Sequence, residues 1–270
     1  METQPPPAAA DAANPLKFTV ATVTYNAGSL IGRTIESVER QTYTCIEHVI
    51  VDGKSADDTL ALVHRYQERN SRREQPRDIV CRTEPDEGIY DAMNKALTLA
   101  TGHYILFLNA GDTLHDDRVL EEIARQIGTQ RPAVVYGRTD IVDDAGRFVR
   151  HRRLEPPARL DWRSLRSGML VCHQSFLART DLAQATPYDL GYRFSADFDW
   201  CLRLLRKAES EPLAPHNTHI VIADFLEGGA TARHHRASLR ERFRIMARHY
   251  GWATTAACHA WFAVRAVLKR

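Results

Sequence analysis

One short stretch, residues 104–112, constrains the fold more than any other part of the chain. It reads Tyr-Ile-Leu-Phe-Leu-Asn-Ala-Gly-Asp, an apolar run that ends in an amide, two small residues and a carboxylate. A strand that is apolar on both faces suits the centre of a parallel sheet covered by helices. Ligands of such sheets bind just beyond the carboxyl ends of the strands, where this pattern places Asp112. The alternative is an ordinary turn, because Asp and Gly are common turn residues.

Strand and helix patterns alternate before this stretch. Residues 18–25 predict a first strand, 45–52 a second and 78–82 a third, while 30–41, 57–70 and 89–100 have helical spacing. Ser55 followed three residues later by Asp58 has the form of a capping box at the second helix. Strands separated by single helices imply right-handed crossovers. The chain therefore predicts an α/β fold with a mostly parallel, Rossmann-like central sheet and flanking helices.

The pattern changes after Asp112, where strands and helices no longer alternate regularly. Residues 159–168 are ambiguous. We expect helices at 119–128, 194–205 and 238–250, strands at 133–138, 171–177 and 219–225, and a hairpin turn at 143–146 before 147–153.

Length and composition limit the class of protein. The 270 residues suffice for one sizeable domain with an appendage or for two small domains. The opening, rich in Pro and Ala, predicts a disordered leader over residues 1–15 and lacks the pattern of a signal peptide, and no apolar run approaches the roughly 20 residues of a membrane span. We therefore expect a cytoplasmic protein. Five scattered cysteines without a Cys-x-x-Cys pair make disulfides or a structural zinc site unexpected.

Charge is unevenly distributed along the chain. The net charge of +2 gives no reason to expect a nucleic-acid partner. Residues 233–270, however, contain eight Arg and one Lys against a single acid, Glu241, so this tail carries +8 and the remainder −6. The tail is an electrostatically distinct part of the chain.

Acid and amide side chains follow each of the first four strands. In a parallel sheet these strand ends meet at one edge, so residues distant in sequence converge. A site this acidic needs a divalent cation if it binds a phosphorylated ligand. Neither Gly-x-Gly-x-x-Gly nor Gly-x-x-x-x-Gly-Lys-Ser/Thr occurs, which disfavours a Rossmann dehydrogenase and a P-loop NTPase. The converging residues are Asn26, Asp52, Glu84, Asp86, Asn109 and Asp112.

Five motifs carry a resemblance to a known family. In order and spacing they resemble the family 2 glycosyltransferases, with the greatest likeness to the bacterial branch that decorates surface glycans, and the resemblance covers residues 18–231. The motifs are Val23-Thr-Tyr-Asn26, Val51-Asp-Gly-Lys-Ser-Ala-Asp-Asp-Thr59, Glu84-Pro-Asp-Glu-Gly-Ile-Tyr-Asp-Ala-Met-Asn-Lys95, Phe107-Leu-Asn-Ala-Gly-Asp112 and Ala196-Asp-Phe-Asp199.

The resemblance implies a GT-A fold over residues 16–232 with a C-terminal helical extension, the basic tail 233–270. It implies a metal-dependent, hexosyltransferase-like enzyme that uses Mn²⁺ or Mg²⁺. Such an enzyme moves a sugar with inversion from a nucleotide-diphosphate-sugar donor to a hydroxyl of a glycan acceptor, in the biosynthesis of cell-surface polysaccharide.

The resemblance also assigns roles to residues of the donor site. Asn109-Ala110-Gly-Asp112 matches the Asp-x-Asp metal motif, but its first acid is replaced by Asn109 and the motif is longer. Asp112 is thus the expected metal ligand, and Asn109 and Ala110 are donor contacts. The other implied nucleotide or donor contacts are Thr24, Tyr25, Asn26, Asp52, Glu84, Asp86, Gly88, Asp91, Asn94 and Lys95.

Asp197 matches the second residue of the family's Glu-Asp motif, whose Asp is the catalytic base, although Ala196 replaces the Glu. The structural alternative is that acids in a first helical turn only cap the helix. Acceptor or phosphate contacts are implied more weakly, since each of these residues also has an ordinary structural explanation. They are His173, Gln174, Asp199 and Gly229, with His234 or His235 as a further contact.

The sequence of the basic tail is compatible with two interpretations of where the tail lies. Residues 238–270, with Trp252 and Trp261 among basic residues, have the composition of an interfacial helix on anionic lipid. Packing against the catalytic domain or a partner helix explains the same pattern. Because acceptors of the resembled family are commonly lipid-linked, we favour a peripheral position on the inner face of the cell membrane.

A non-catalytic sugar-nucleotide-binding or scaffold subunit of a glycan-assembly complex is the main alternative function, and a nucleotidyltransferase is a third.

Overall fold

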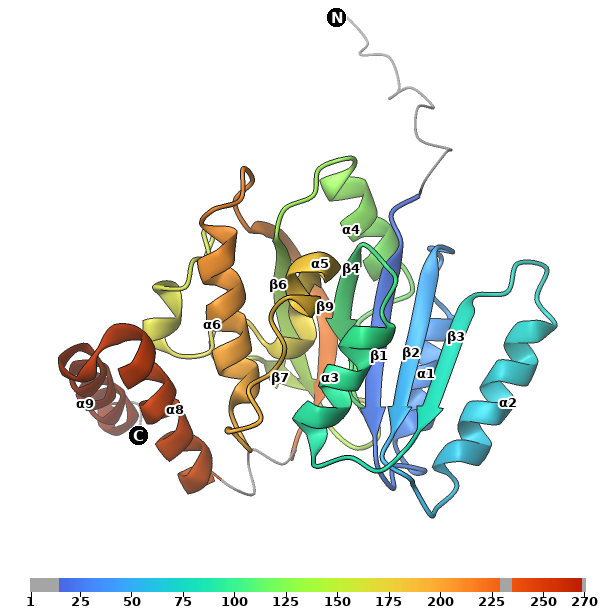
Figure 1. Ribbon diagram of the computed structural model, residues 1–270, viewed down its shortest axis with the longest axis horizontal. Helices are drawn as coiled ribbons and strands as arrows, with labels where there is room; N and C mark the ends of the chain where they lie inside the picture. The colour runs from blue at the N-terminus through green and yellow to red at the C-terminus, as the bar shows by residue number, and fades with distance from the viewer. Residues whose placement is uncertain (1–14, 229–234, 269–270) are drawn as a thin grey trace, which may run out of the picture.

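The computed structural model of the protein describes residues 15–228 and 235–268, and its described strands form one sheet (Figure 1). The strand order is β3-β2-β1-β4-β8-β6-β9-β5, with β7 paired to β6. The strands are β1 (Phe18–Thr24), β2 (Ile46–Asp52), β3 (Asp78–Thr83), β4 (Tyr104–Phe107), β5 (Thr113–Leu114), β6 (Val134–Val142), β7 (Phe148–His151), β8 (Phe176–Arg179) and β9 (His216–Leu226).

Helices cover both faces of the sheet. Apolar side chains of α3 and α6 pack on one face, and those of α1, α2 and α4 pack on the other. The helices are α1 (Ile31–Glu39), α2 (Thr59–Ser71), α3 (Ile89–Leu99), α4 (Val119–Ile127), α5 (Thr180–Gln184), α6 (Ala196–Ala208), α8 (His235–Tyr250) and α9 (Trp252–Leu268), with 3₁₀ turns η1 (Ser164–Ser167) and η2 (His173–Ser175).

The sheet has a parallel half and a mixed half. Strands β3, β2, β1 and β4 are parallel, and every residue of β1, β2 and β4 is buried, which explains their apolar sequences. Strand β8 then runs antiparallel to β4 and β6, while β9 is parallel to β6. The fold is thus α/β with a mostly parallel N-terminal half. Thr24, Asp52 and Thr83 are register neighbours, so these strand ends meet at one edge as predicted.

Two local predictions were wrong. The strand predicted over residues 171–177 begins only at Phe176, because ladder pairing with β4 and β6 is confined to β8 and His173–Ser175 turn as η2. The capping box is also absent. The Ser55 hydroxyl donates to the buried carboxylate of Asp52 instead, and Asp57 accepts the backbone N–H of Thr59.

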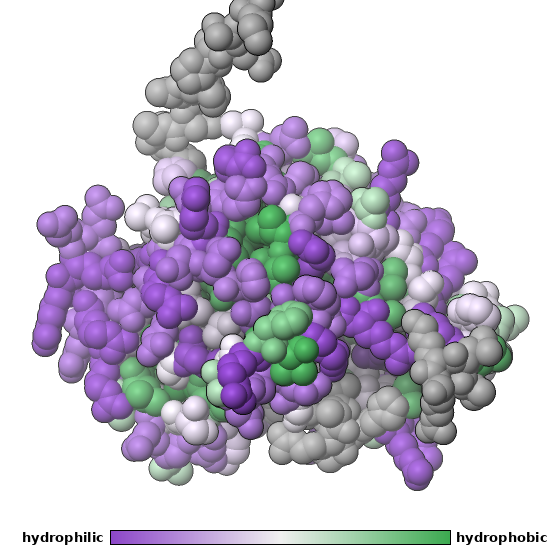
Figure 2. Space-filling model, turned by 180° about the vertical axis from the view of Figure 1, so that it is seen from behind, coloured by the Kyte–Doolittle hydropathy of each residue, from purple (hydrophilic) through white to green (hydrophobic). Residues whose placement is uncertain are grey.

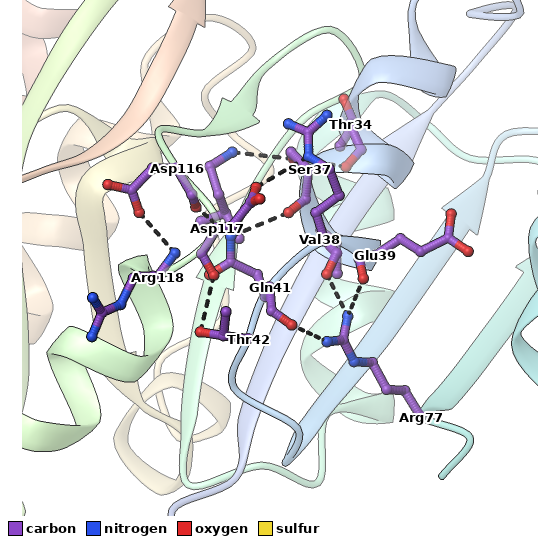
Figure 3. A network of polar contacts seen from close by, with 12 residues as sticks. Thr34, Ser37, Val38, Glu39, Gln41, Thr42, Arg77, Asp116, Asp117 and Arg118 are labelled. Carbon is purple, nitrogen blue, oxygen red and sulfur yellow. Dashed lines mark hydrogen bonds and ion pairs between the residues drawn. The ribbon is translucent and has the colours of Figure 1, made fainter. Parts of the chain in front are cut away.

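Helix α1 holds the segment that carries Asp112 through two of its hydroxyl side chains, Thr34 and Ser37, which Figure 3 labels. The Thr34 hydroxyl donates to the backbone carbonyl of Asp112 at 2.7 Å and accepts the N–H of Gly111 at 2.9 Å. The Ser37 hydroxyl accepts the N–H of Leu114 at 3.2 Å. Both hydroxyls are buried, so they satisfy backbone groups of the loop that water does not reach.

The side chain of buried Arg77 caps the C-terminal end of α1 (Figure 3). Its guanidinium donates to the carbonyls of Val38, Glu39, Gln41 and Tyr43. These carbonyls lie at and just beyond the C-terminal end of the helix, where a cation interacts favourably with the helix dipole. Arg77 thereby fixes the end of the helix on which the Asp112 segment rests.

Helix α8 packs on the body of the protein beside α6 (Figure 1). Ile245 and Met246 are buried in the same apolar cluster as α3 and α6. The carboxylate of Glu241, the single acid of the tail, accepts the backbone N–H groups of Arg193 and Phe194 at 2.9 and 2.7 Å, just before α6. This part of the basic tail therefore supports the start of α6.

The described helices include no segment with both the length and the apolar character of a bilayer span. Seen from behind, the molecular surface is mostly hydrophilic and its apolar residues form small separate patches (Figure 2).

The contacts of Arg77 generate a stability prediction. Arg77→Met should lower the free energy of unfolding by about 3 kcal/mol, because several buried carbonyls lose their donor at once. Urea unfolding of the purified protein measures the change. Arg72→Met is the matched control, since Arg72 is exposed beside the same loop and its side chain donates to none of these four carbonyls, and it should cost less than about 0.5 kcal/mol. Equal losses in the two variants would contradict the capping role.

Candidate functional site

A cavity of about 940 Å³ lies at the carboxyl ends of the central strands. Its walls come from the ends of β1, β4 and β9, from the first turns of α3 and α6, from η2 and from the chain after β7. Among its lining residues are Thr24, Tyr25, Asn26, Tyr90, Asn109, Ala110, Asp112, Arg152, Arg153, His173, Gln174, Asp197, Leu226 and Arg242.

Asp112 is buried in the wall of this cavity. One carboxylate oxygen accepts the backbone N–H of Leu226 at 2.9 Å, and the other accepts the side-chain amide of Gln174 at 3.0 Å. Burial raises the pKa of Asp112 to about 7, although these two hydrogen bonds and the charge of Arg33 oppose the rise. Burial therefore destabilises the charged form of Asp112, and a cation bound beside the carboxylate would stabilise that form.

Asn109 supplies a second oxygen near the same strand end. Its side-chain Oδ1 is buried and has no hydrogen-bond partner among the described residues. A buried amide oxygen without a donor fits a divalent cation such as Mn²⁺ or Mg²⁺, which take oxygen ligands. Asp112 and Asn109 are therefore the residues of this wall that would hold the ion implied by the sequence.

Asp197 lies in the first turn of α6 and lines the same cavity. The phenolic hydroxyl of Tyr90, from the first turn of α3, donates to its Oδ1 at 3.2 Å. Tyr90 stacks on Tyr188 with ring centroids 5.7 Å apart. Two helices thus fix this carboxylate through side chains that are themselves packed, as a positioned acid–base group requires.

His173 is part of an aromatic wall. Its ring packs against Phe107 and Trp200, with centroids 5.3 and 5.5 Å away, and Nε2 lies 2.7 Å from the hydroxyl of Tyr188. Burial lowers the pKa of His173 to about 4, so the ring is neutral at pH 7. A neutral, packed imidazole shapes the cavity. It does not offer phosphate a positive charge.

The predicted nucleotide end is built around Asp52. This buried carboxylate accepts the N–H and hydroxyl of Ser55 at 2.9 and 2.5 Å, and the Ser55 hydroxyl accepts the N–H of Asn26 at 2.8 Å. Asn26 has a φ of 48°, a left-handed conformation that Asn tolerates better than most residues. Asp52 therefore shapes the loop that places Tyr25 and Asn26 at the cavity.

Asp86 reaches the same edge from the loop after β3. A Cβ on Gly53 would lie 2.4 Å from Asp86 Oδ2, so with any other residue here the Asp86 carboxylate would have to move away. Asp86 Oδ1 accepts the N–H of Gly88 at 3.0 Å, which fixes the start of α3. Gly88 has a φ of 128°. The structure thus brings Asp86 and Gly88 together next to Asp52.

Other predicted contacts are engaged locally. Lys95 pairs with Asp91 at 3.1 Å and with Glu84 at 3.3 Å. The side-chain amide of Asn94 makes two hydrogen bonds to the backbone of Tyr188, at 2.7 and 3.0 Å. None of these four side chains lines the cavity. They hold α3 to its neighbours.

Asp199 is also held in ion pairs outside the cavity. Its buried carboxylate bonds Arg203 at 2.6 Å and His249 of α8 at 2.9 Å. Gly229 and His234 lie outside the described residues, and His235 is described only as the first residue of α8.

Four arginines of the cavity were not predicted from the sequence: Arg150, Arg152, Arg153 and Arg242. Arg242 comes from α8. Its guanidinium lies 5.5 Å from the ring centre of Phe198, and its buried Nε has no hydrogen-bond partner among the described residues. Arg152 donates to the backbone carbonyls of Leu154, Met169 and Leu170. No motif marked them, because one comes from strand β7, two from the irregular loop after it and one from the tail.

A family model described as "Glycosyl transferase family 2" matches residues 19–184 of the chain. A relative from Mycobacterium tuberculosis, named "PGL/p-HBAD biosynthesis glycosyltransferase", is 31% identical over 214 residues, which cover 78% of this chain and 77% of the relative. The "Amylovoran biosynthesis glycosyltransferase AmsB" of Erwinia amylovora is 29% identical over 198 residues, which cover 70% of this chain and 64% of AmsB.

Solved GT-A glycosyltransferases share the fold. S. aureus TarS 1-349, solved in complex with UDP, superposes with a TM-score of 0.64 at 18% identity, over 86% of this chain and 64% of that chain. The mannosyltransferase PcManGT from Pyrobaculum calidifontis, solved with GDP-Man and Mn²⁺, has a TM-score of 0.62 at 17% identity, over 97% of this chain and 79% of that chain. The predicted GT-A fold is thereby confirmed.

The burial of Asp112 generates a prediction for the metal-free protein. An unfolded Asp loses its proton near pH 4, whereas folded Asp112 keeps it to about pH 7, so folding stability falls as pH rises from about 4 to 7. Asp112→Asn cannot ionise and should escape this fall. Urea unfolding at pH 5 and pH 8 should show the variant gaining on the order of 2 kcal/mol relative to the wild type. If the free energies of unfolding of the two proteins differed by the same amount at pH 5 and pH 8, the proposed destabilisation by the buried Asp112 charge would be contradicted.

Proposed function

The chain belongs to glycosyl transferase family 2, and from this premise we propose that it is a metal-dependent inverting glycosyltransferase of surface-glycan biosynthesis. The observation that carries the proposal is one cavity lined by both Asp112, a buried carboxylate suited to a cation, and Asp197, a carboxylate fixed by two helices. These are the two groups that an inverting transfer needs.

Asp197 is the proposed base. Its carboxylate accepts the proton of the acceptor hydroxyl as that oxygen attacks the anomeric carbon from the face opposite the leaving diphosphate. The hydrogen bond from Tyr90 holds the carboxylate in place during this step. Asp112 and Asn109 would hold the divalent ion, which when bound would stabilise the negative charge of the departing diphosphate.

The donor is proposed to be a nucleotide-diphosphate sugar. In support, TarS 1-349 and PcManGT, which share the fold, were solved with UDP-GlcNAc and with GDP-Man. Tyr25 and Asn26 line one end of the cavity, with Asp52 and Asp86 behind them, and this end would take the nucleotide. Arg153 and Arg242 line the same cavity and supply positive charge for an anionic substrate.

The acceptor is proposed to be a lipid-linked glycan or a glycolipid. The support is the naming of relatives for biosynthesis of PGL/p-HBAD and of amylovoran. A non-catalytic sugar-nucleotide-binding or scaffold subunit remains the second candidate function. It is favoured by Ala196 and Asn109, which replace acids of the family motifs.

Donor turnover tests the catalytic proposal. With Mn²⁺ and a panel of UDP-, GDP- and dTDP-sugars, at least one donor should be hydrolysed slowly in the absence of acceptor. Asp197→Asn and Asp112→Asn should each reduce this rate by about 100-fold or more, because they remove the base and the metal ligand. Asp117→Asn, a change at an exposed acid outside the cavity, is the control with unchanged rate.

Metal-dependent donor binding without turnover, even with a lipid-linked acceptor present, would establish the scaffold reading instead. Calorimetric titration with the same donors separates binding from hydrolysis.

The protein is further proposed to act at the inner face of the cell membrane through α9. Trp252 and Trp261 of this helix are 71% and 58% exposed, and exposed tryptophans near basic residues suit a membrane interface. Replacing both by Ser should weaken binding to anionic phospholipid vesicles by about tenfold or more in a sedimentation assay. Leu190→Ser, at an exposed apolar residue before α6, is the control. Unchanged vesicle binding in the double variant would refute this attachment.

A further inference from the structure

We propose that the protein has a second divalent-cation site, separate from the cavity, formed by His115, Asp140 and Asp224 with His151 beside them. One potential ligand atom from each of the first three residues lies within 4.8 Å of the other two. His151 Nδ1 lies 2.8 Å from Asp140 Oδ1. None of the four residues lines the cavity that holds Asp112 and Asp197.

The sheet forces the two carboxylates together. Asp140 of β6 and Asp224 of β9 are register neighbours on adjacent parallel strands, so their side chains point to the same face. Their side chains are only 8% and 17% exposed. Like charges placed opposite each other on a sheet are destabilising, and burial increases the cost. This position therefore requires a compensating positive charge.

No permanently charged side chain among the described residues provides that charge. In the described parts of the chain, neither carboxylate forms an ion pair with a Lys or Arg side chain, although arginines are abundant elsewhere. Their partners are two imidazoles, His115 with Asp224 at 2.8 Å and His151 with Asp140 at 2.8 Å. The hydrogen bond to Asp224 raises the pKa of His115, so this ring offers at most one positive charge, whereas a bound divalent ion balances both carboxylates.

The donor set indicates the class of ion. Two carboxylate oxygens with one or two imidazole nitrogens are typical of Zn²⁺ and Co²⁺ sites, whereas Mg²⁺ and Ca²⁺ take mainly oxygen ligands. The exposed side of His115 and of His151 leaves a route for the ion to enter. The ligands come from the residue after β5 and from β6, β7 and β9, so the ion would join these neighbouring strands (Figure 1).

The location gives the ion a structural effect on the cavity. Asp224 is two residues before Leu226, whose backbone N–H holds the Asp112 carboxylate, and His115 is three residues after Asp112. An ion bridging Asp224 and His115 would cross-link both segments that meet at this hydrogen bond. We expect it to raise thermal stability without being the ion of the catalytic step.

The test uses the full chain and two probes, Zn²⁺ for affinity and Co²⁺ for its visible absorption. Titration of the Asp112→Asn variant, in which the cavity site is impaired, should still show one saturable site. Bound Co²⁺ should show the intense visible absorption that is typical of this ion at low coordination number. Adding Asp224→Asn, which keeps the size of the side chain, should weaken Zn²⁺ binding by more than the roughly 10–100-fold that loss of an outer-shell partner costs. His115→Ala should have the same effect, and Asp116→Asn, at the exposed acid next to it, should have none.

Two results would overturn the proposal. One is Zn²⁺ or Co²⁺ binding that disappears with Asp112→Asn alone, since the ion would then occupy only the cavity. The other is ion binding to the Asp112→Asn protein that neither Asp224→Asn nor His115→Ala weakens, since the ion would then lie outside the cluster. Crystals soaked in Co²⁺ check the location independently of folding, because anomalous scattering should place an ion between Asp140 and Asp224.

Discussion

The burial of the Asp112 carboxylate is the constraint on which the rest of the site depends. A carboxylate inside a protein needs donors on every accessible lone pair, and here they come from the β9 backbone and from Gln174 of the 3₁₀ turn η2. On the other side, hydroxyls of α1 hold the backbone of the same segment. Three elements, β9, η2 and α1, therefore meet at the segment of one acid, and the mixed half of the sheet brings β9 there.

The two acids of the proposed mechanism are supported in different ways. Asp112 is fixed by backbone and amide donors within a low-dielectric wall, which raises its pKa. Asp197 is fixed by one phenol at a helix start and faces the open cavity. A cation bound beside Asp112 would offset the free-energy cost of burying its charge, which suits a metal ligand. Asp197 lines the cavity, where an acceptor hydroxyl can reach it, which suits a base.

The basic tail has a role inside the fold as well as on its surface. Glu241 holds the turn that precedes α6, His249 pairs with the buried carboxylate of Asp199, and Arg242 reaches the cavity. Helix α8 therefore belongs to the wall that carries Asp197. A deletion of the tail would disturb this wall and any membrane contact together, so point changes on exposed α9 residues separate the two roles.

The sequence by itself determined the α/β class, the parallel direction of the first strands and the convergence of their polar ends. These follow from local patterns, since both-face burial requires apolar strands and a parallel sheet aligns its carboxyl ends. Tertiary structure decided which of the converging residues face the cavity: Asn109 does, whereas Lys95, Asn94 and Asp199 are engaged elsewhere. It also added Arg242 and paired Asp140 with Asp224. Long-range packing sets these contacts, and no local spacing encodes which distant side chain will be the neighbour.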